Sequence, residues 1–306
     1  MSLEALNKRI KTTEDLRDIV STMKMLSSVS IGPYEKALSS LKEYGKTVRD
    51  AFLGFMINGD SDFSLPKPKT QNKKILAVLI GTDNGLVGRF NRDVFNYSQK
   101  FLKERNIPKS NALYVCVGKR IGSVTSNAVS DALKGTYAIS NSLKEIASIA
   151  SALLLKINDI LSKYDIQEVI VFHNYKEPSK PQQPRHIQLM PLPYEEFTAL
   201  KKRKWEGKSL PYLPAPKAQL FSELVHEYLT VALAGSLTAS LAAEHYARMV
   251  NMQQAEKNID KSLEDMNLYY QQARQTEITD ELIDIVSGAE AMKPKKTLSF
   301  DDKSLR

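Results

Sequence analysis

The chain has 306 residues, of which 42% are hydrophobic and 25% charged, and its formal net charge is +8. This composition is typical of a folded globular protein and excludes the disordered, collagen-like and disulfide-rich classes. The single cysteine, Cys116, can form neither an internal disulfide nor a cysteine metal cluster. No segment approaches the roughly 20 apolar residues of a membrane span, and the N-terminus has no apolar signal-peptide core, so we expect a soluble, unexported protein.

The positive charge is unevenly distributed along the chain. Residues 61–216 carry a net charge of +11, whereas residues 217–292 carry −7. A basic middle segment could bind nucleic acid. Its most basic run, residues 201–204, has only Trp205 as an aromatic neighbour, whereas single-strand sites combine basic and stacking aromatic side chains. We therefore interpret this run as part of a solvated linker and expect no nucleic-acid partner.

The first 58 residues have the period of an amphipathic helix. Apolar side chains recur on one face at intervals of three, four or their sums, beginning with Leu3, Leu6, Ile10, Leu16, Val20, Met23 and Leu26. A second series ends near Phe55, and Gly32 and Pro33 lie between the two. Because a proline inside a helix removes a hydrogen bond and clashes with the preceding turn, we expect a kink or break there. Residues 59–72, with two prolines and two lysines, are expected to form a linker.

Residues 73–200 have the alternating pattern of an α/β domain. Short apolar runs typical of buried strands are separated by longer segments of helical character. The expected strands are residues 75–80, 113–117, 169–172 and 186–192, and the expected helices are residues 91–105 and 140–164. This alternation predicts a Rossmann-like domain, with a parallel sheet covered by helices.

A second long helix is predicted over residues 217–292. Residues 217–287 contain no proline and one glycine, Gly235, and about 70 helical residues would reach about 105 Å. So long a helix needs a partner for its apolar stripe, and the N-terminal helix, residues 1–58, is available. The predicted fold class is α/β, with a long antiparallel coiled coil of both chain ends and an inserted α/β domain. Residues 201–216 are expected to be a linker and residues 293–306 a disordered tail.

The turn after the first expected strand, residues 81–89, is the main candidate for nucleotide binding. It has three glycines but matches neither GxGxxG nor GxxxxGK[ST], so we favour a structural turn. The four histidines lack metal-ligand spacing, Cys116 has no charged neighbour to activate its thiol, and no GxSxG elbow is present. We expect no catalytic residue, no metal site and no cofactor.

Three separated motifs nevertheless resemble one known family. Residues 247–252 and 270–289 look like the C-terminal signature of the γ subunit of F-type ATP synthases. Residues 9–11 with 23–28 resemble the N-terminal helix of that family, and residues 81–91 resemble its glycine-rich turn. The resemblance implies a central rotor shaft that couples transmembrane ion flow to ATP synthesis or hydrolysis.

This resemblance also implies partners, location and roles for individual residues. The shaft would stand inside a ring of α and β subunits, with catalysis in β, and its α/β domain would lie beside ε and the membrane rotor ring. The chain itself would be non-catalytic, without direct membrane insertion, on the cytoplasmic face of the inner (plasma) membrane. Contacts with β are implied at Met23, Arg248, Gln275, Thr279 and Glu281, and a low-friction apolar tip at Ile283, Ile285, Val286, Gly288 and Ala289.

Two departures from the family pattern concern residues 29–34, which interrupt a basic helical stretch, and the added tail, residues 293–306. They suggest a divergent branch, of which a sodium-linked synthase is one form. Two other functional classes stay open: a coiled-coil scaffold or adaptor, and a nucleotide-binding α/β enzyme.

Overall fold

The computed structural model describes residues 2–58, 73–140, 142–177, 180–193, 205, 209 and 211–292. The chain forms two compact units, one from Met1–Ser21 with Gln254–Arg306 and one from Thr22–Gln253. The expected linker at residues 59–72 and the expected tail at 293–306 lie outside the described residues, as does most of the linker expected at 201–216. Across the described part of the chain, no helix is both long and apolar enough to cross a membrane.

The N-terminal segment is one continuous helix, α1 (Leu3–Asn58), with Pro33 inside it. Of the kink or break expected at Gly32 and Pro33, the break is therefore wrong, and a kink within the continuous helix stays a prediction. Pro33 cannot donate to the carbonyl of Val29, but both residues are exposed, so water can satisfy that carbonyl. The next residue, Tyr34, is 4% exposed and belongs to the main hydrophobic core, which holds the helix across the missing hydrogen bond.

Helix α6 (Lys217–Ala291) has 75 residues and pairs with α1. In the larger unit, the ring of Phe52 packs edge-on against Tyr228 with centroids 6.2 Å apart, and Tyr34 stacks on His245 with centroids 5.1 Å apart. The contact further along α6 is made to a residue nearer the start of α1. The two helices are therefore antiparallel in this unit.

The smaller unit contains the first turns of α1 and the C-terminal half of α6. Leu6 and Ile10 are buried there, at 2% and 7% exposure. Arg17 Nε donates to Asp260 Oδ1 at 2.5 Å. The predicted fold class, with paired terminal helices and an inserted α/β domain, is confirmed.

The larger unit contains a five-stranded sheet of order β3-β2-β1-β4-β5. Its strands are β1 (Ile75–Ile80), β2 (Ala112–Val117), β3 (Leu133–Tyr137), β4 (Glu168–Tyr175) and β5 (Gln183–Met190). The first four are parallel, and β5 is antiparallel to β4. Every residue of the central strand β1 is buried, which explains its uninterrupted apolar sequence.

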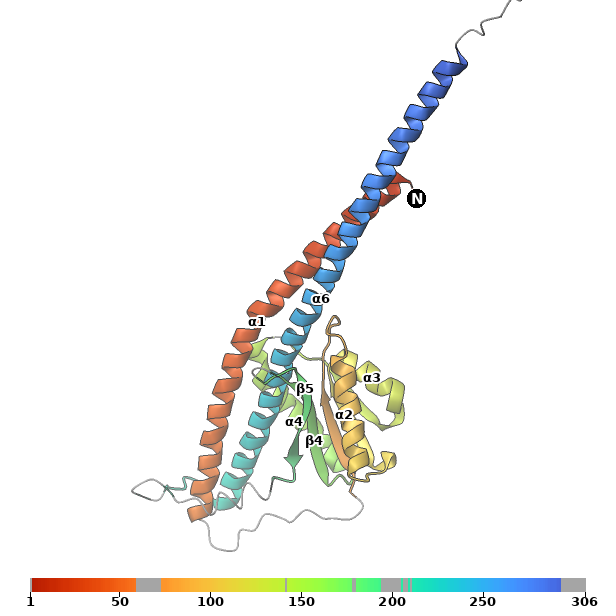
Figure 1. Ribbon diagram of the computed structural model, residues 1–306. Helices are drawn as coiled ribbons and strands as arrows, with labels where there is room; N and C mark the ends of the chain where they lie inside the picture. Colours follow the sequence, from red (N-terminus) through yellow and green to blue (C-terminus); the bar gives the residue numbers. More distant parts are fainter. Residues whose placement is uncertain are drawn as a thin grey trace, which may run out of the picture. The chain divides into compact units, whose positions relative to one another are not determined.

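Helices cover both faces of the sheet (Figure 1). Helices α2 (Phe90–Glu104) and α3 (Lys119–Val129) pack on one face. Helix α4 (Ile146–Lys163) packs on the other, together with residues of α1 and α6. Short 3-10 helices at Lys109–Asn111, Ser130–Ala132 and Leu143–Glu145 complete the regular structure of the described residues.

Candidate functional site

The glycine-rich turn, residues 81–91, is closed by hydrogen bonds between its own residues and its neighbours. Thr82 N donates to Asn91 Oδ1 at 3.0 Å, and Asn91 Nδ2 donates back to Thr82 Oγ1 at 3.0 Å. Asp83 Oδ1 accepts from Lys119 N at 2.7 Å, and its Oδ2 accepts from Ile139 N at 3.3 Å. The carboxylate of Asp83 thus occupies the start of α3, where an anionic ligand would bind a helix N-terminus. This geometry favours a structural turn over a phosphate site.

The turn lies directly against helix α6. Gly88 has a φ of +62°, and a Cβ atom there would lie 2.9 Å from Asn251 Oδ1. The side chains of Val87 and Phe90 form a buried cluster with two small residues of α6, Ala243 and Ala247. The glycine and the two alanines allow close approach of backbone to helix, so the turn acts as a joint between the α/β domain and α6.

An ion pair is buried next to this joint. Arg248 Nη2 donates to Glu244 Oε1 at 2.5 Å, and the two residues are 7% and 2% exposed. Burial raises the pKa of Glu244, Arg248 opposes that rise, and the negative charge of Asp83 adds to it. Burial, helped by Arg248, lowers the pKa of His245 to about 4, so this imidazole is neutral at pH 7.

The residues implied as contacts with β lie in both units. Met23 is half-buried on α1, and Arg248 is held inside the larger unit by Glu244. In the smaller unit Gln275, Thr279 and Glu281 are exposed on α6. Thr279 Oγ1 donates to the Gln275 backbone carbonyl at 2.8 Å, so these two residues lie one helical turn apart.

The residues implied as an apolar tip are exposed on the C-terminal turns of α6. The exposed fractions of the large side chains there are 56% for Ile283, 68% for Ile285 and 58% for Val286. Gly288 and Ala289 are exposed as well. Clustered apolar side chains on a surface indicate a site of contact with another protein.

The reactive side chains of the α/β domain are core residues. Cys116 is fully buried, and burial raises the pKa of its thiol to about 11. Burial lowers the pKa of His173 to about 4. Within the described ranges, no three or more His, Cys, Asp and Glu side chains gather into a possible metal site.

No sequence pattern indicates the joint on α6. Ala243, Ala247 and Asn251 follow at intervals of four, but alanines spaced by four are ordinary in any buried helix. The stacking of Tyr34 on His245 was missed for a similar reason: the two residues are more than 200 positions apart, and no local pattern joins them.

Comparison with known proteins extends this description. A family model described as ATP synthase matches residues 2–292. The ATP synthase gamma chain of Geotalea daltonii is 26% identical over 296 residues, covering 95% of this chain and 99% of the relative. That of Geobacter metallireducens is 28% identical over 297 residues, with the same coverage.

Two solved structures have the same fold. A chain of the Euglena gracilis mitochondrial ATP synthase superposes with a TM-score of 0.66 at 16% identity, covering 99% of both chains. A chain from the central stalk and c-ring of the Tetrahymena thermophila mitochondrial ATP synthase gives a TM-score of 0.55 at 18% identity, covering 78% of this chain and 99% of the other. The family model spans nearly the whole chain, and the gamma chains of both relatives are matched over 99% of their length. This chain therefore belongs to the γ-chain family of ATP synthases.

Proposed function

We infer that the chain is the central rotor shaft of a rotary F-type ATP synthase or ATPase, and that it couples ion flow across a membrane to catalysis at the β subunits. The chain is a non-catalytic subunit. The observation that carries this inference is the change in exposure along α6. Between residues 233 and 248 every residue is buried except the half-buried Gly235 and Tyr246, whereas no residue from 253 to 289 is buried. One helix is therefore anchored in a folded domain and presents a long free surface to partners.

The buried joint suits the transmission of torque. A rotation applied to one element is transmitted to its neighbour only where the two are closely packed, because close-packed interiors transmit strain. The contact of Gly88 with Asn251 and the cluster of Val87 and Phe90 with α6 provide such packing. A shaft that offers a different surface to each subunit of a ring can favour a different conformation in each, since a partner shifts an equilibrium by its differential affinity.

The partners of this shaft are the α and β subunits, the ε subunit and the membrane rotor ring. The structural relative from Euglena gracilis belongs to a complex of F1 with the c-ring, which supports these partners for a chain of the same family. The net charge of +11 over residues 61–216 suits a position next to ε and the membrane ring. We propose the cytoplasmic face of the inner (plasma) membrane as the location, with the chain held there peripherally through the complex.

We further propose Met23, Arg248, Gln275, Thr279 and Glu281 as contacts with β. Arg248 is buried and its Nη2 is paired with Glu244, so a contact with an acidic group of β needs the remaining N–H donors of the guanidinium to become accessible. The apolar tip would rotate inside a surrounding apolar surface (the apolar sleeve), with which it makes no hydrogen bonds or ion pairs. Its residues are Ile283, Ile285, Val286, Gly288 and Ala289.

The division of the chain into a shaft helix at 1–58, an α/β domain at 73–200 and a shaft helix at 217–292 is likewise a proposal. The linkers at 59–72 and 201–216 and the tail at 293–306 complete it. Its support is the pattern of proline, glycine and charge in the sequence, since most residues of the linkers and the tail lie outside the described ranges.

Affinity purification of the tagged chain from cells of its source organism tests the proposed function as a rotor shaft. We expect α and β to co-purify in a fixed ratio. Their absence, with other proteins recovered instead, would favour the scaffold or adaptor. The nucleotide-binding enzyme is tested by calorimetric titration of the isolated chain with ATP, because tight stoichiometric binding contradicts a passive shaft.

A further inference from the structure

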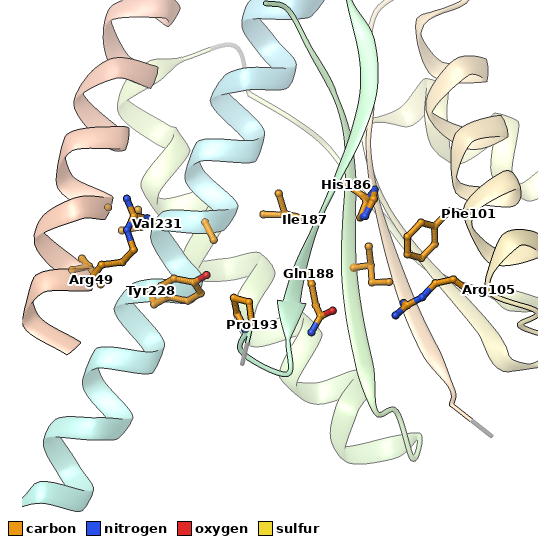
Figure 2. Close-up of a pocket in the computed structure, with 13 residues that line it drawn as sticks. Arg49, Phe101, Arg105, His186, Ile187, Gln188, Pro193, Tyr228 and Val231 are labelled. Atoms are coloured by element: carbon orange, nitrogen blue, oxygen red, sulfur yellow. The ribbon is translucent and has the colours of Figure 1, made fainter. Parts of the chain in front are cut away.

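A crevice follows the outer edge of strand β5. The cavity there has a volume of about 640 Å³ and is lined by residues of α1, α2, α6, β4 and β5 (Figure 2). His186 and Gln188 lie on one face of β5 and Ile187 lies on the other, yet all three line the cavity. The cavity therefore encloses the edge of the strand rather than one face of the sheet.

This edge has unused hydrogen-bonding capacity. β5 is the last strand of the sheet, and it pairs through its inner edge with β4. Among the residues that the structure describes, no strand pairs with its outer edge, so alternate backbone groups are left for another strand. A second cavity of about 480 Å³ shares six lining residues with the first and continues the crevice along the same edge.

The charge of the crevice has one sign. The two cavities are lined by four cationic side chains and by no Asp or Glu, the four being Lys42, Arg49, Arg105 and Arg185. Arg105 is paired with Glu168 at 2.8 Å, and Arg185 is paired with Glu177. Arg49 and Lys42 form no ion pair among the described residues, although Lys42 lies close enough to Glu43 to help lower the pKa of that carboxyl. Both cations can therefore accept a carboxylate from a ligand.

We propose that this crevice binds an extended acidic segment of a partner protein, which adds to β5 as a sixth strand and pairs its carboxylates with Arg49 and Lys42. Addition of a strand to a free sheet edge is an established mode of peptide recognition, in which main-chain bonds give affinity and side-chain pockets give specificity. The apolar lining by Val48, Ile187 and Val231 suits apolar side chains that alternate with the acidic ones. A small anion would satisfy the arginine and leave the strand edge unused, which is why we favour a peptide.

Fluorescence anisotropy with the full-length chain tests this proposal. The probe is a labelled heptapeptide in which valine alternates with aspartate and glutamate. We expect saturable binding that weakens as salt is raised, and no binding of the matching peptide with lysine at the acidic positions. Two further peptides carry N-methyl groups at alternate positions, one set on odd and one on even residues, and at least one of these should lose binding because strand pairing needs its N–H groups. Binding that survives both methylation patterns, or equal binding of the lysine peptide, overturns the proposal.

Variants of the chain locate the binding site. Arg49→Glu and, separately, Lys42→Glu should each weaken peptide binding about tenfold. Lys36→Glu is the matched control, because Lys36 is exposed on the same helix and lines neither cavity, and it should change binding less than twofold. Hydrogen exchange of the unaltered chain should slow in residues 183–190 when the acidic peptide is added. Protection elsewhere, or equal weakening by Lys36→Glu, would exclude β5 as the site.

Discussion

Gly88 and Asn251 meet at the joint between the α/β domain and helix α6, where a Cβ on Gly88 would lie 2.9 Å from Asn251 Oδ1. The contact joins a turn that follows the first strand to a helix more than 150 residues later in the chain. Neither residue has a chemical role of its own. Their importance is geometric, since a side chain on Gly88 would meet the end of the Asn251 side chain.

Substitution of Gly88 by alanine should destabilise the chain. The left-handed backbone at φ +62° disfavours a side chain, and the combined strain and overlap should cost about 1–3 kcal/mol of the free energy of unfolding, measured by urea denaturation. Gly235→Ala is the matched control: a Cβ there meets nothing within 4 Å, and alanine in place of glycine inside a helix should stabilise by about 0.5–1 kcal/mol. A Gly88→Ala chain as stable as the unaltered one would contradict the role of this contact.

Variants of the buried pair Glu244 and Arg248 can separate an effect on stability from an effect on partner contact. Arg248→Ala leaves a carboxylate buried without its cation, and this should cost about 3–5 kcal/mol of stability. Replacing both residues, as Glu244→Leu with Arg248→Met, should restore most of that loss because a well-packed apolar pair is roughly equivalent.

Reconstituted complexes then decide whether Arg248 meets β. If it does, the double variant should pump fewer ions per ATP hydrolysed despite its recovered stability, and Arg248→Ala with Gln275→Ala should be uncoupled as well. Full coupling in both would remove Arg248 and Gln275 from the proposed contacts.

Acid should weaken the α/β domain through His173. Burial lowers the pKa of this residue from 6.5 to about 4, so between these values the unfolded chain binds a proton that the folded chain does not. Stability is therefore present above pH 6.5 and is lost as pH falls, by about 2 kcal/mol at pH 5 for this group. Urea denaturation at pH 7 and pH 5 measures the loss, and His173→Gln should reduce the difference by that amount. An unchanged difference would assign the acid sensitivity to other groups.

A charge introduced into the apolar tip should impair the assembled complex without changing the stability of the chain itself. Ile285 is 68% exposed, so Ile285→Asp should change the free energy of unfolding by less than about 0.5 kcal/mol. In the complex the buried carboxylate would lose its hydration, and ATP hydrolysis or assembly should fall. Asp284→Asn, a neighbouring exposed position, serves as the control. Normal activity of Ile285→Asp would argue against an apolar sleeve around these residues.

Limited proteolysis tests the proposed division of the chain. A short trypsin digest should cut first within the linkers at 59–72 and 201–216 and after residue 292, which contain lysines outside the predicted elements. Mass spectrometry identifies the fragments. Early cleavage at Lys100 or Lys156, inside helices of the α/β domain, would contradict the division.

The predictable part of the fold is the part with strong periodicity. The runs that became β1, β2 and β4 were predicted because β1 and β2 are apolar throughout and β4 contains the buried apolar run at residues 169–172. Strand β3 was missed because it lies at the sheet edge, where Lys134, Gly135 and Thr136 need no apolar character. Helix α3 was missed because its sequence, with a glycine and several small polar residues, has little intrinsic helical preference.

The candidate site was predictable only through the resemblance to a family. Gln275 and Ile285 are unremarkable as isolated residues, and their roles came from long matching motifs at both chain ends. The pairing of Arg248 with Glu244 follows from their spacing of four on one helix. Its burial was beyond either route, because that depends on the three-dimensional packing of α6 against the glycine-rich turn.

Pro33 gives helix α1 a mechanical property. A helix lacking one hydrogen bond bends more easily at that turn than elsewhere, and proline is the commonest cause of such bending. Tyr34, immediately after it, is fixed in the core of the larger unit. Elastic deformation of α1 under load would therefore concentrate in the turn from Val29 to Pro33, which can bend and recover without exposing the core.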